Sequence, residues 1–421
     1  MTAWRRARTS SAVVVTRSRG GRARCFAQGH LASALMSVAA GCTDAVAHLP
    51  VRFGDGVFAP DIDRLLAPGA PRDDDTVAAV LQALRADNPE TFGFTPAPAN
   101  TVRAPGEHEP RRALRMVYPG WEDHDDFYGH LIQGATGHGV VHVHLLRHRD
   151  RWRLRALLNR FGVAWRQVQV HTAPTVESIW IRDYGPLSVE VGGRPCVVDG
   201  RYNVDSVHDD AMASRLARAA GVPVLRPPLL LEGGNLLSDG QGTCFTTHNL
   251  AACNRLTEEE LAVLLDRYFG FRRVVFLEPL SGDVIDHVDM LLAVADADTL
   301  LLARADPLMD PDNHAILEEN AARLATLQAP SGQPYRIVRV PMPPPLPYNP
   351  ANDSPHHVRS YLNLVPFNGV VLVPVFRASL HLEHEALAQI AAAFPGREVV
   401  PIPADTVAAS YGAVRCATQT S

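Results

Sequence analysis

The sequence predicts an α/β fold built from repeated units of two short strands and a helix. From Arg112 to the C-terminus, short β-rich runs alternate with helical patterns, and several of these runs come in pairs before the next helix. Such an order favours ββα-type units over one doubly wound parallel sheet. Because no sequence repeat at a fixed period accompanies it, this expectation depends on the element pattern alone.

The elements follow from hydrophobic periodicity and from turn residues at the ends of each run. We expect strands at Ala113–Tyr118, Val140–Leu146, Trp165–Val170, Pro195–Val198, Val222–Leu225, Val274–Leu277, Thr299–Leu302, Ile337–Val340, Val370–Val373 and Glu398–Pro401. We expect helices at Arg151–Arg160, Asp210–Ala220, Thr257–Phe269, Pro311–Leu327 and Leu382–Phe394. The third helix has a capping box, since Thr257 is followed three residues later by Glu260.

The composition is that of a globular protein with a substantial core, with 46% hydrophobic and 20% charged residues among 421. A net charge of −5 argues against a general nucleic-acid binder. All 40 basic residues are arginine, so lysine Schiff bases, a pyridoxal phosphate anchor and a P-loop lysine are excluded. The sequence has no stretch of 18 uninterrupted apolar residues, so it predicts no transmembrane helix.

The chain divides into three parts by composition. Residues 1–45 combine an arginine-rich start with an apolar run before Gly41-Cys42, which is typical of an export signal of the lipoprotein kind. A mis-assigned leader is the alternative, so the localisation stays open between cytoplasmic and exported. Residues 46–110, rich in Pro, Asp and Gly, predict an extension or linker, and residues 111–421 predict the main folded domain.

The stretch from Ser178 to Leu187, S-I-W-I-R-D-Y-G-P-L, predicts a strand that runs into a tight turn. Asp183 could offer both carboxylate oxygens to a planar cation, and Trp180 a flat face for the same cation. A structural alternative is an ion pair between Arg182 and Asp183 that fixes the turn.

Three later segments also carry candidate site residues. Glu232-Gly233-Gly234-Asn235 precedes Asp239-Gly240. The paired glycines would let the backbone approach a ligand closely, and the alternative is an ordinary hairpin with an Asp-Gly turn. In a strand, His287 and Asp289 would share one face. They could then act as a general acid/base beside a carboxylate, and the alternative is a surface salt-bridge cluster. Near the C-terminus, Cys416 is either a nucleophile of lowered pKa or a buried, inert thiol.

Five segments occur in one order along the chain: W-I-R-D-Y-G-P, E-G-G-N with D-G-x-G-T, H-V-D, S-Y-L-N and R-C-A-T-Q. Together they resemble the agmatine deiminase and bacterial-type peptidylarginine deiminase family of guanidine-modifying enzymes, over about residues 112 to 421. The resemblance implies a five-bladed α/β propeller of ββαβ-type units. It also implies a cysteine-based amidine hydrolase that needs neither metal nor organic cofactor.

The resemblance further implies a role for each matching residue. Cys416 matches the nucleophile, His287 the general acid/base, and Asp183 and Asp289 the carboxylates that hold the guanidinium. Further substrate-binding candidates are Trp180, which matches an aromatic wall of the pocket, Asn363, Arg182, Glu232, Asn235 and Arg415. The expected product is a ureido group, and agmatine would give N-carbamoylputrescine on a route to putrescine.

Two departures from the family pattern concern the substrate. Asp286 stands where the family usually has glycine, and Arg415 where it usually has histidine. If strand alternation turns Arg415 away from Cys416, its charge would line a neighbouring wall and favour a substrate with a carboxylate. Pairing with a local acid, or exposure to solvent, is the alternative. Peptidyl or free arginine is the alternative to agmatine as substrate, and a catalytically silent guanidine-binding protein is the alternative to an enzyme. The oligomeric state, a homo-oligomer included, stays open.

Overall fold

The computed structural model describes residues 88–172, 176–202, 206–345 and 358–421, with residues 85 and 86 and the backbone of two short strands, β1 (Val13–Thr16) and β2 (Arg22–Cys25). Those two strands pair antiparallel. Apart from them, the predicted export signal or leader within residues 1–45 lies outside the described residues. Among the described helices, none has both the length and the apolar composition needed to cross a bilayer.

The strands of residues 102–421 form five separate small sheets. In three of these sheets an antiparallel pair is extended by a strand that joins in parallel after a crossover, which is the ββαβ order. Of the other two sheets, one has this order with a further antiparallel strand at its edge, and the other has three parallel strands with one antiparallel edge strand. The two four-stranded sheets consist of β19 (Thr418–Thr420), β4 (Ala113–Tyr118), β5 (Val140–Leu145) and β6 (Val168–Thr172), and of β3 (Val102–Arg103), β7 (Leu187–Val191), β8 (Arg194–Val198) and β9 (Val224–Leu225). The first two three-stranded sheets consist of β10 (Leu237–Ser238), β11 (Thr243–Thr247) and β12 (Arg273–Leu277), and of β13 (Leu292–Val294), β14 (Thr299–Arg304) and β15 (Arg336–Pro341). The last consists of β16 (Val365–Phe367), β17 (Val370–Val375) and β18 (Glu398–Pro403).

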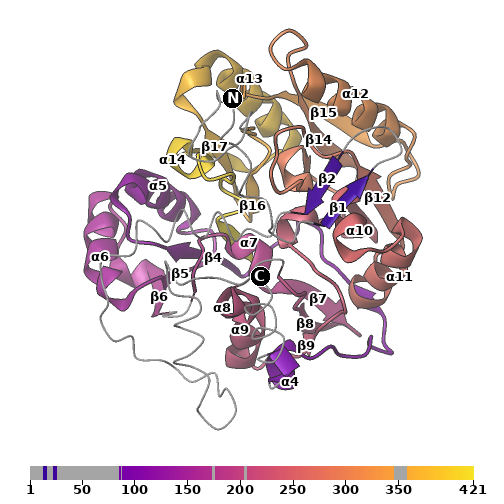
Figure 1. Ribbon diagram of the computed structural model, residues 1–421. Coiled ribbons are helices and arrows are strands. Elements are labelled where there is room, and N and C mark those ends of the chain that lie inside the picture. Colours follow the sequence, from indigo (N-terminus) through magenta and orange to yellow (C-terminus); the bar gives the residue numbers. More distant parts are fainter. Residues whose placement is uncertain are drawn as a thin grey trace, which may run out of the picture.

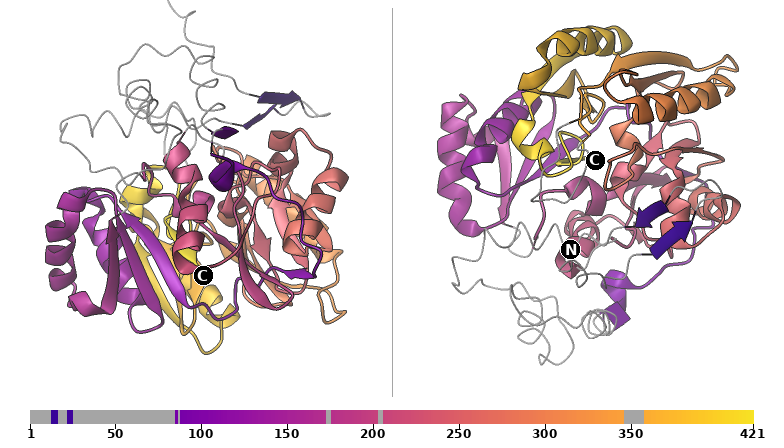
Figure 2. Two further views of the ribbon diagram at one scale, coloured as in Figure 1. Left: turned by 90° about the horizontal axis from the view of Figure 1, so that it is seen from below. Right: turned by 45° about the horizontal axis from the view of Figure 1, so that its top comes forward.

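Helices connect the parallel strands and lie mostly on the outside of the sheets (Figures 1 and 2). Some also pack against the neighbouring unit, since α5 contacts β17 and β18, and α13 contacts β14 and β15. The helices are α4 (Pro89–Phe92), α5 (Asp125–Ala135), α6 (Arg151–Arg160), α7 (Ile181–Tyr184), α8 (Val207–Asp210), α9 (Met212–Ala220), α10 (His248–Asn254), α11 (Glu258–Phe269), α12 (Pro311–Ala325), α13 (Leu380–Ala393) and α14 (Asp405–Ala408). These contacts join several units through one continuous apolar core.

Most predicted elements are confirmed with shifts of one to three residues at their ends. β4 and α6 have the predicted bounds, and the capping box of α11 is formed, because Glu260 N donates to Thr257 Oγ1 and Thr257 N to Glu260 Oε2. The predicted strand at Trp165–Val170 begins instead as a 3-10 turn, and β6 starts at Val168.

Two predicted strands that carry candidate site residues are wrong. The approach to Tyr184-Gly185 is the short helix α7, and His287 precedes a 3-10 turn, η5 (Val288–Met290). Tertiary hydrogen bonds override strand propensity in both places. Arg182 N donates to the carbonyl of Cys416, and Val288 N donates to the side chain of Asn235, so neither backbone segment is available for a ladder.

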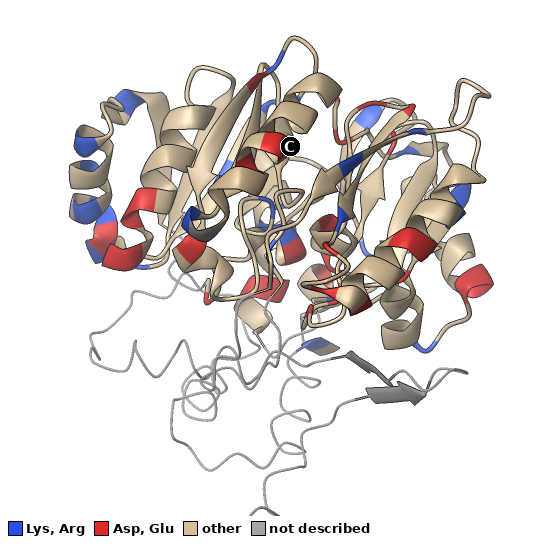
Figure 3. Ribbon diagram, turned by 90° about the horizontal axis from the view of Figure 1, so that it is seen from above, with Lys and Arg blue, Asp and Glu red and all other residues tan. Residues whose placement is uncertain are grey.

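Strand β3 comes from the stretch predicted as an extension and pairs with β7. The C-terminal end lies in the middle of the molecule (Figure 1). Glu107, which follows β3 in the chain, contacts Arg415 close to that end. Seen from above, acidic and basic positions are interspersed over the helices and loops (Figure 3). Neither sign of charge is confined to one part of the elements seen in this view.

Candidate active site

Cys416 lies in a turn directly before β19, with its side chain 1% exposed. The fully buried side chain of Asn363 holds this turn. Asn363 Oδ1 accepts hydrogen bonds from the backbone N–H groups of Arg415 (3.0 Å) and Cys416 (3.2 Å), and its Nδ2 donates to Cys416 Sγ at 3.1 Å. Because two N–H donors fix the amide oxygen, the amide nitrogen must face the sulfur.

The surroundings of Cys416 favour the thiol over the thiolate. Burial, followed by the carboxylates of Asp289 and Asp183, raises the pKa of Cys416 well above its usual value. The amide of Asn363 acts in the opposite direction, and Asp289 Oδ2 lies 3.9 Å from Sγ. A cation placed between these carboxylates would remove the main electrostatic obstacle to the thiolate.

His287 is positioned by its backbone and by an acidic partner. Its N–H donates to Asp283 Oδ2 (3.1 Å), and its Nε2 lies 2.9 Å from Glu232 Oε2. Burial lowers the pKa of His287, but Asp183, Glu232 and Asp289 outweigh it and raise the pKa to about 10. His287 is therefore an imidazolium near neutral pH, which suits a general acid. Its Nδ1 has no hydrogen-bond partner among the described residues.

Asp183 faces this imidazolium, with Oδ1 3.7 Å from His287 Nδ1. The same oxygen accepts a hydrogen bond from Gly234 N at 3.0 Å. Burial raises the pKa of Asp183 to about 7 although His287 lowers it. A Cβ atom at Gly234 would lie 2.4 Å from His287 Nδ1 and 2.7 Å from Asp183 Oδ1, so only glycine allows this approach.

Asp289 is shared with Arg415. Arg415 Nη1 donates to Asp289 Oδ2 at 2.9 Å, while Nη2 donates to Glu107 Oε2 (3.2 Å) and to the carbonyl of Leu236 (3.1 Å). Asp289 Oδ1 is buried without a hydrogen-bond partner in the described part of the chain. Two hydrogen-bonded carboxylates thus surround Arg415, and one acceptor of Asp289 remains for a ligand.

The prediction that strand alternation turns Arg415 away from Cys416 is wrong in its premise, because residues 414–417 form a turn and not a strand. Arg415 is also buried and not exposed to solvent. Of the two alternatives left open by the sequence, pairing with local acids is what the structure shows.

Trp180 packs against the turn of the nucleophile. A Cβ atom at Gly412 would lie 2.4 Å from the ring of Trp180 and 2.9 Å from Cβ of Cys416. Gly412 therefore leaves room for the ring directly beside the cysteine. Asp286, which stands where the resembling family usually has glycine, has a φ of 55°, a backbone conformation that Asp tolerates better than most residues.

Arg182 and Asn235 direct their side chains to structural partners. Arg182 Nη1 donates to Gln419 Oε1 at 2.7 Å, and the described residues contain no ion pair between Arg182 and Asp183. Asn235 Oδ1 accepts from the backbone N–H of Thr247 and of Val288, which fixes the start of η5. Both side chains hold the segments that carry the catalytic candidates.

Sequence reasoning assigned no role to Glu107 or Asp283. Glu107 lies 308 positions before Arg415, in a stretch without any motif, so no local pattern could reveal the pair. Asp283 had a usable signal, since an Asp that precedes a loop can accept backbone N–H groups two to four residues later. It does so with Ile285 and His287.

No group of three or more His, Cys, Asp or Glu side chains in the described residues has a geometry suited to a metal ion. The candidate site consists of charged side chains, a thiol and an amide. Such a set provides a nucleophile, a proton donor and two acceptors for a cation.

Comparison with known proteins gives one consistent result. The family described as Porphyromonas-type peptidyl-arginine deiminase matches residues 103–421. A relative from Marinomonas sp. (strain MWYL1), provisionally named agmatine deiminase, is 25% identical over 366 residues, which cover 77% of this chain and 96% of the relative.

Solved structures agree with this result. A provisionally named arginine deiminase from Porphyromonas gingivalis is 27% identical with a TM-score of 0.66, over 76% of this chain and 98% of that one. An agmatine deiminase from Enterococcus faecalis is 19% identical with a TM-score of 0.67, over 78% of this chain and 98% of that one. The mixed α/β fold is therefore that of the agmatine and arginine deiminase structures.

Proposed function

Because the chain belongs to the Porphyromonas-type peptidyl-arginine deiminase family, we propose that it deiminates a small guanidine, with agmatine as the first candidate substrate. As a member of this family it is a hydrolase that acts on carbon–nitrogen bonds of amidines. The proposed products are N-carbamoylputrescine and ammonia, which would place the enzyme on a route to putrescine.

One observation carries the proposal. The thiol of Cys416, the imidazolium of His287 and the carboxylates of Asp183 and Asp289 lie together in a buried site, with Asp289 Oδ1 and His287 Nδ1 lacking hydrogen-bond partners among the described residues. The buried acceptor on Asp289 fits a ligand that is cationic and rich in N–H groups, and the free N–H at His287 Nδ1 fits a proton donor beside that ligand. A guanidinium has both properties.

Two carboxylates are needed because the guanidinium is stabilised by resonance and resists attack until its nitrogens are held. In this chain Arg415 occupies Oδ2 of Asp289. We therefore assign Oδ1 of Asp289 and the carboxylate of Asp183 to the substrate, one on each side. Trp180 would form a wall against the planar group, as proposed from the sequence.

The reaction then proceeds in two halves. Substrate binding brings a positive charge beside Cys416, which lowers the pKa of the thiol and releases its proton to solvent. The thiolate attacks the central carbon, His287 donates its proton to one amino group, and ammonia leaves. A cationic thiouronium on Cys416 and a neutral His287 remain.

Water completes the second half. Neutral His287 takes a proton from water, and the hydroxide adds to the thiouronium carbon. Collapse of this adduct expels the Cys416 thiolate, and the protonated urea loses its hydroxyl proton to solvent. Glu232, 2.9 Å from His287 Nε2, keeps the ring oriented in both halves.

We also propose that the five ββαβ units are the blades of a five-bladed α/β propeller. The combination of antiparallel and parallel pairing in each of the five sheets supports this, as does the position of the C-terminal end in the middle of the molecule (Figure 1). In such an arrangement, residues from several units meet at the centre. Asp183, Glu232, His287, Asn363 and Cys416 lie in or next to different units.

Deimination of free or peptidyl arginine is the second candidate. It is favoured by the likeness to the provisionally named arginine deiminase from Porphyromonas gingivalis. Against a protein substrate, Cys416 and His287 are each 1% exposed in the structure, which leaves little access for a side chain on a folded surface.

The test is ureido-product formation from agmatine, arginine and an arginyl peptide, measured side by side. Cys416→Ser should reduce turnover at least about a thousandfold, because a serine hydroxyl is far less ionised than a thiol near neutral pH. Cys196→Ser, which alters another buried free cysteine, is the control and should retain activity. Full turnover in Cys416→Ser would remove the covalent mechanism.

A further inference from the structure

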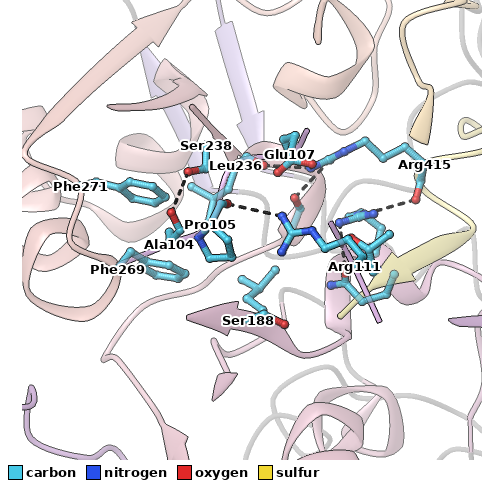
Figure 4. Close-up of a pocket in the computed structure, with 15 residues that line it drawn as sticks. Ala104, Pro105, Glu107, Arg111, Ser188, Leu236, Ser238, Phe269, Phe271 and Arg415 are labelled. Atoms are coloured by element: carbon cyan, nitrogen blue, oxygen red, sulfur yellow. Dashed lines mark hydrogen bonds and ion pairs between the residues drawn. The ribbon is translucent and has the colours of Figure 1, made fainter. Parts of the chain in front are cut away.

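A second feature of the middle of the molecule is a pocket next to Arg415 (Figure 4). It has a volume of about 470 Å³, counting the space that is open to solvent. Its lining includes Glu107, Arg111, Arg182, Arg415 and Gln419 and none of the catalytic candidates Cys416, His287, Asp183 and Asp289. The pocket is thus distinct from the proposed guanidine site.

The charged lining of this pocket is mostly positive. Three arginines face one carboxylate, Glu107, and Glu107 is already bonded to Arg415. Burial and the neighbouring Arg415 lower the pKa of Arg182 to about 9, and burial lowers the pKa of Arg111 as well. Burial is the main cause of both shifts, and the neighbouring carboxylates only partly offset it.

Two buried donors of the pocket also lack partners. Arg111 Nε and Gln419 Nε2 have no hydrogen-bond acceptor among the described residues. The orientation of the Gln419 amide is fixed, because its Oε1 accepts from Arg182 Nη1 (2.7 Å) and from Thr420 N (3.0 Å). Its Nε2 is therefore a donor, and a buried donor without an acceptor is destabilising.

We propose that this pocket binds a small oxyanion, a carboxylate or a phosphate, on Arg111, Arg182 and Gln419. An oxyanion supplies the missing acceptors and the missing negative charge together. Figure 4 places Phe269 and Phe271 at the other end of the pocket from Arg111 and Arg415, so an apolar group attached to the anion has room to pack there.

The proposed site adjoins the catalytic side through Arg415. One nitrogen of its guanidinium binds Asp289 and the other binds Glu107, which lines the pocket. An anion beside Glu107 competes for that second nitrogen and changes the electrostatic potential at Asp289. Binding itself needs no turnover, so the inference can succeed or fail independently of the proposed reaction.

The experiment is calorimetric titration of the full chain with inorganic phosphate and, separately, with acetate, each against sodium chloride at equal ionic strength. Wild-type protein should show saturable binding of at least one oxyanion. Gln419→Glu keeps the acceptor for Arg182 but replaces the free donor by a negative charge, and it should weaken binding at least about tenfold. Arg111→Gln should weaken it by a similar factor.

Arg112→Gln is the matched control, because it removes the same charge from the next residue, which is exposed. It should bind like the wild type, and thermal unfolding of each variant shows whether the fold is retained. The comparison of phosphate with acetate identifies the preferred oxyanion. Absence of saturable binding by both ions, or equal binding by the wild type, Gln419→Glu and Arg111→Gln, overturns the proposal.

Discussion

The two sides of Arg415 differ in the sign of their charge. On the catalytic side, the carboxylates of Asp183, Glu232 and Asp289 outnumber the imidazolium of His287. On the pocket side, arginines outnumber the one carboxylate, Glu107. Within the part of the chain that the structure describes, each side also has buried atoms without a hydrogen-bond partner, an acceptor on Asp289 and donors on Arg111 and Gln419. The comparison teaches that one buried arginine can separate a proposed cation site from a proposed anion site.

The largest effect should come from Asp289→Asn, because it changes both sides at once. The variant loses a carboxylate for the substrate and leaves the Arg415 charge with one acidic partner. We expect a loss of about 3–5 kcal/mol in stability and at least about a hundredfold in kcat/KM. Asp183→Asn should lower kcat/KM by a comparable factor with a smaller change in unfolding free energy. Denaturant unfolding and steady-state kinetics on both variants distinguish the two roles.

Glu107→Gln changes the pocket side first. Removing the one carboxylate among the pocket residues leaves three buried arginines facing each other, so we expect a loss of roughly 2–4 kcal/mol in unfolding free energy. If the pocket binds oxyanions, phosphate should restore part of this stability and should bind more tightly than to the wild type. A thermal melt with and without phosphate measures this, and the absence of any stability change would contradict the described ion pair.

The catalytic side should give a pH dependence of stability opposite in sign to that of the pocket side, where burial lowers the pKa of Arg182 to about 9. Burial lowers the pKa of His287, but its acidic neighbours raise it to about 10, above its ordinary value of 6.5. The imidazolium therefore stabilises the fold fully below about pH 6.5, and this contribution is lost as the pH rises through about 10. Unfolding midpoints across this range should fall more steeply for the wild type than for His287→Gln, and kcat should decline near the upper end.

The smallest effect concerns substrate choice. Arg415→His removes a fixed charge beside Asp289 and makes the guanidine site more negative. We expect the ratio of kcat/KM for agmatine to that for arginine to rise about tenfold, or about 1.4 kcal/mol, since agmatine has a distal ammonium and arginine a carboxylate. Arg112→His is the control. An unchanged ratio would show that Glu107 and Asp289 already neutralise the charge of Arg415.

The sequence was sufficient for features that depend on local physics. Helix α6 and strand β4 were predicted with the same first and last residues as in the structure, because apolar spacing and flanking turns mark them. The candidates Asp183, His287, Asp289 and Cys416 were found because each stands in a short motif, and the motifs occur in one order. The local conformations of α7 and η5 were missed, because the hydrogen bonds that their backbones donate to Cys416 and Asn235 override the strand propensity of these segments.

By itself, then, the sequence determined the α/β unit pattern and the candidates for the nucleophile, the proton donor and the two carboxylates of the proposed site. Only the tertiary structure decided which groups these side chains meet. The ion pair of Arg415 with Glu107 spans 308 positions and that with Asp289 spans 126, and neither is encoded in a local pattern. Buried charges acquire their partners through packing of distant segments, because the cost of leaving a charge unpaired arises only when water is excluded.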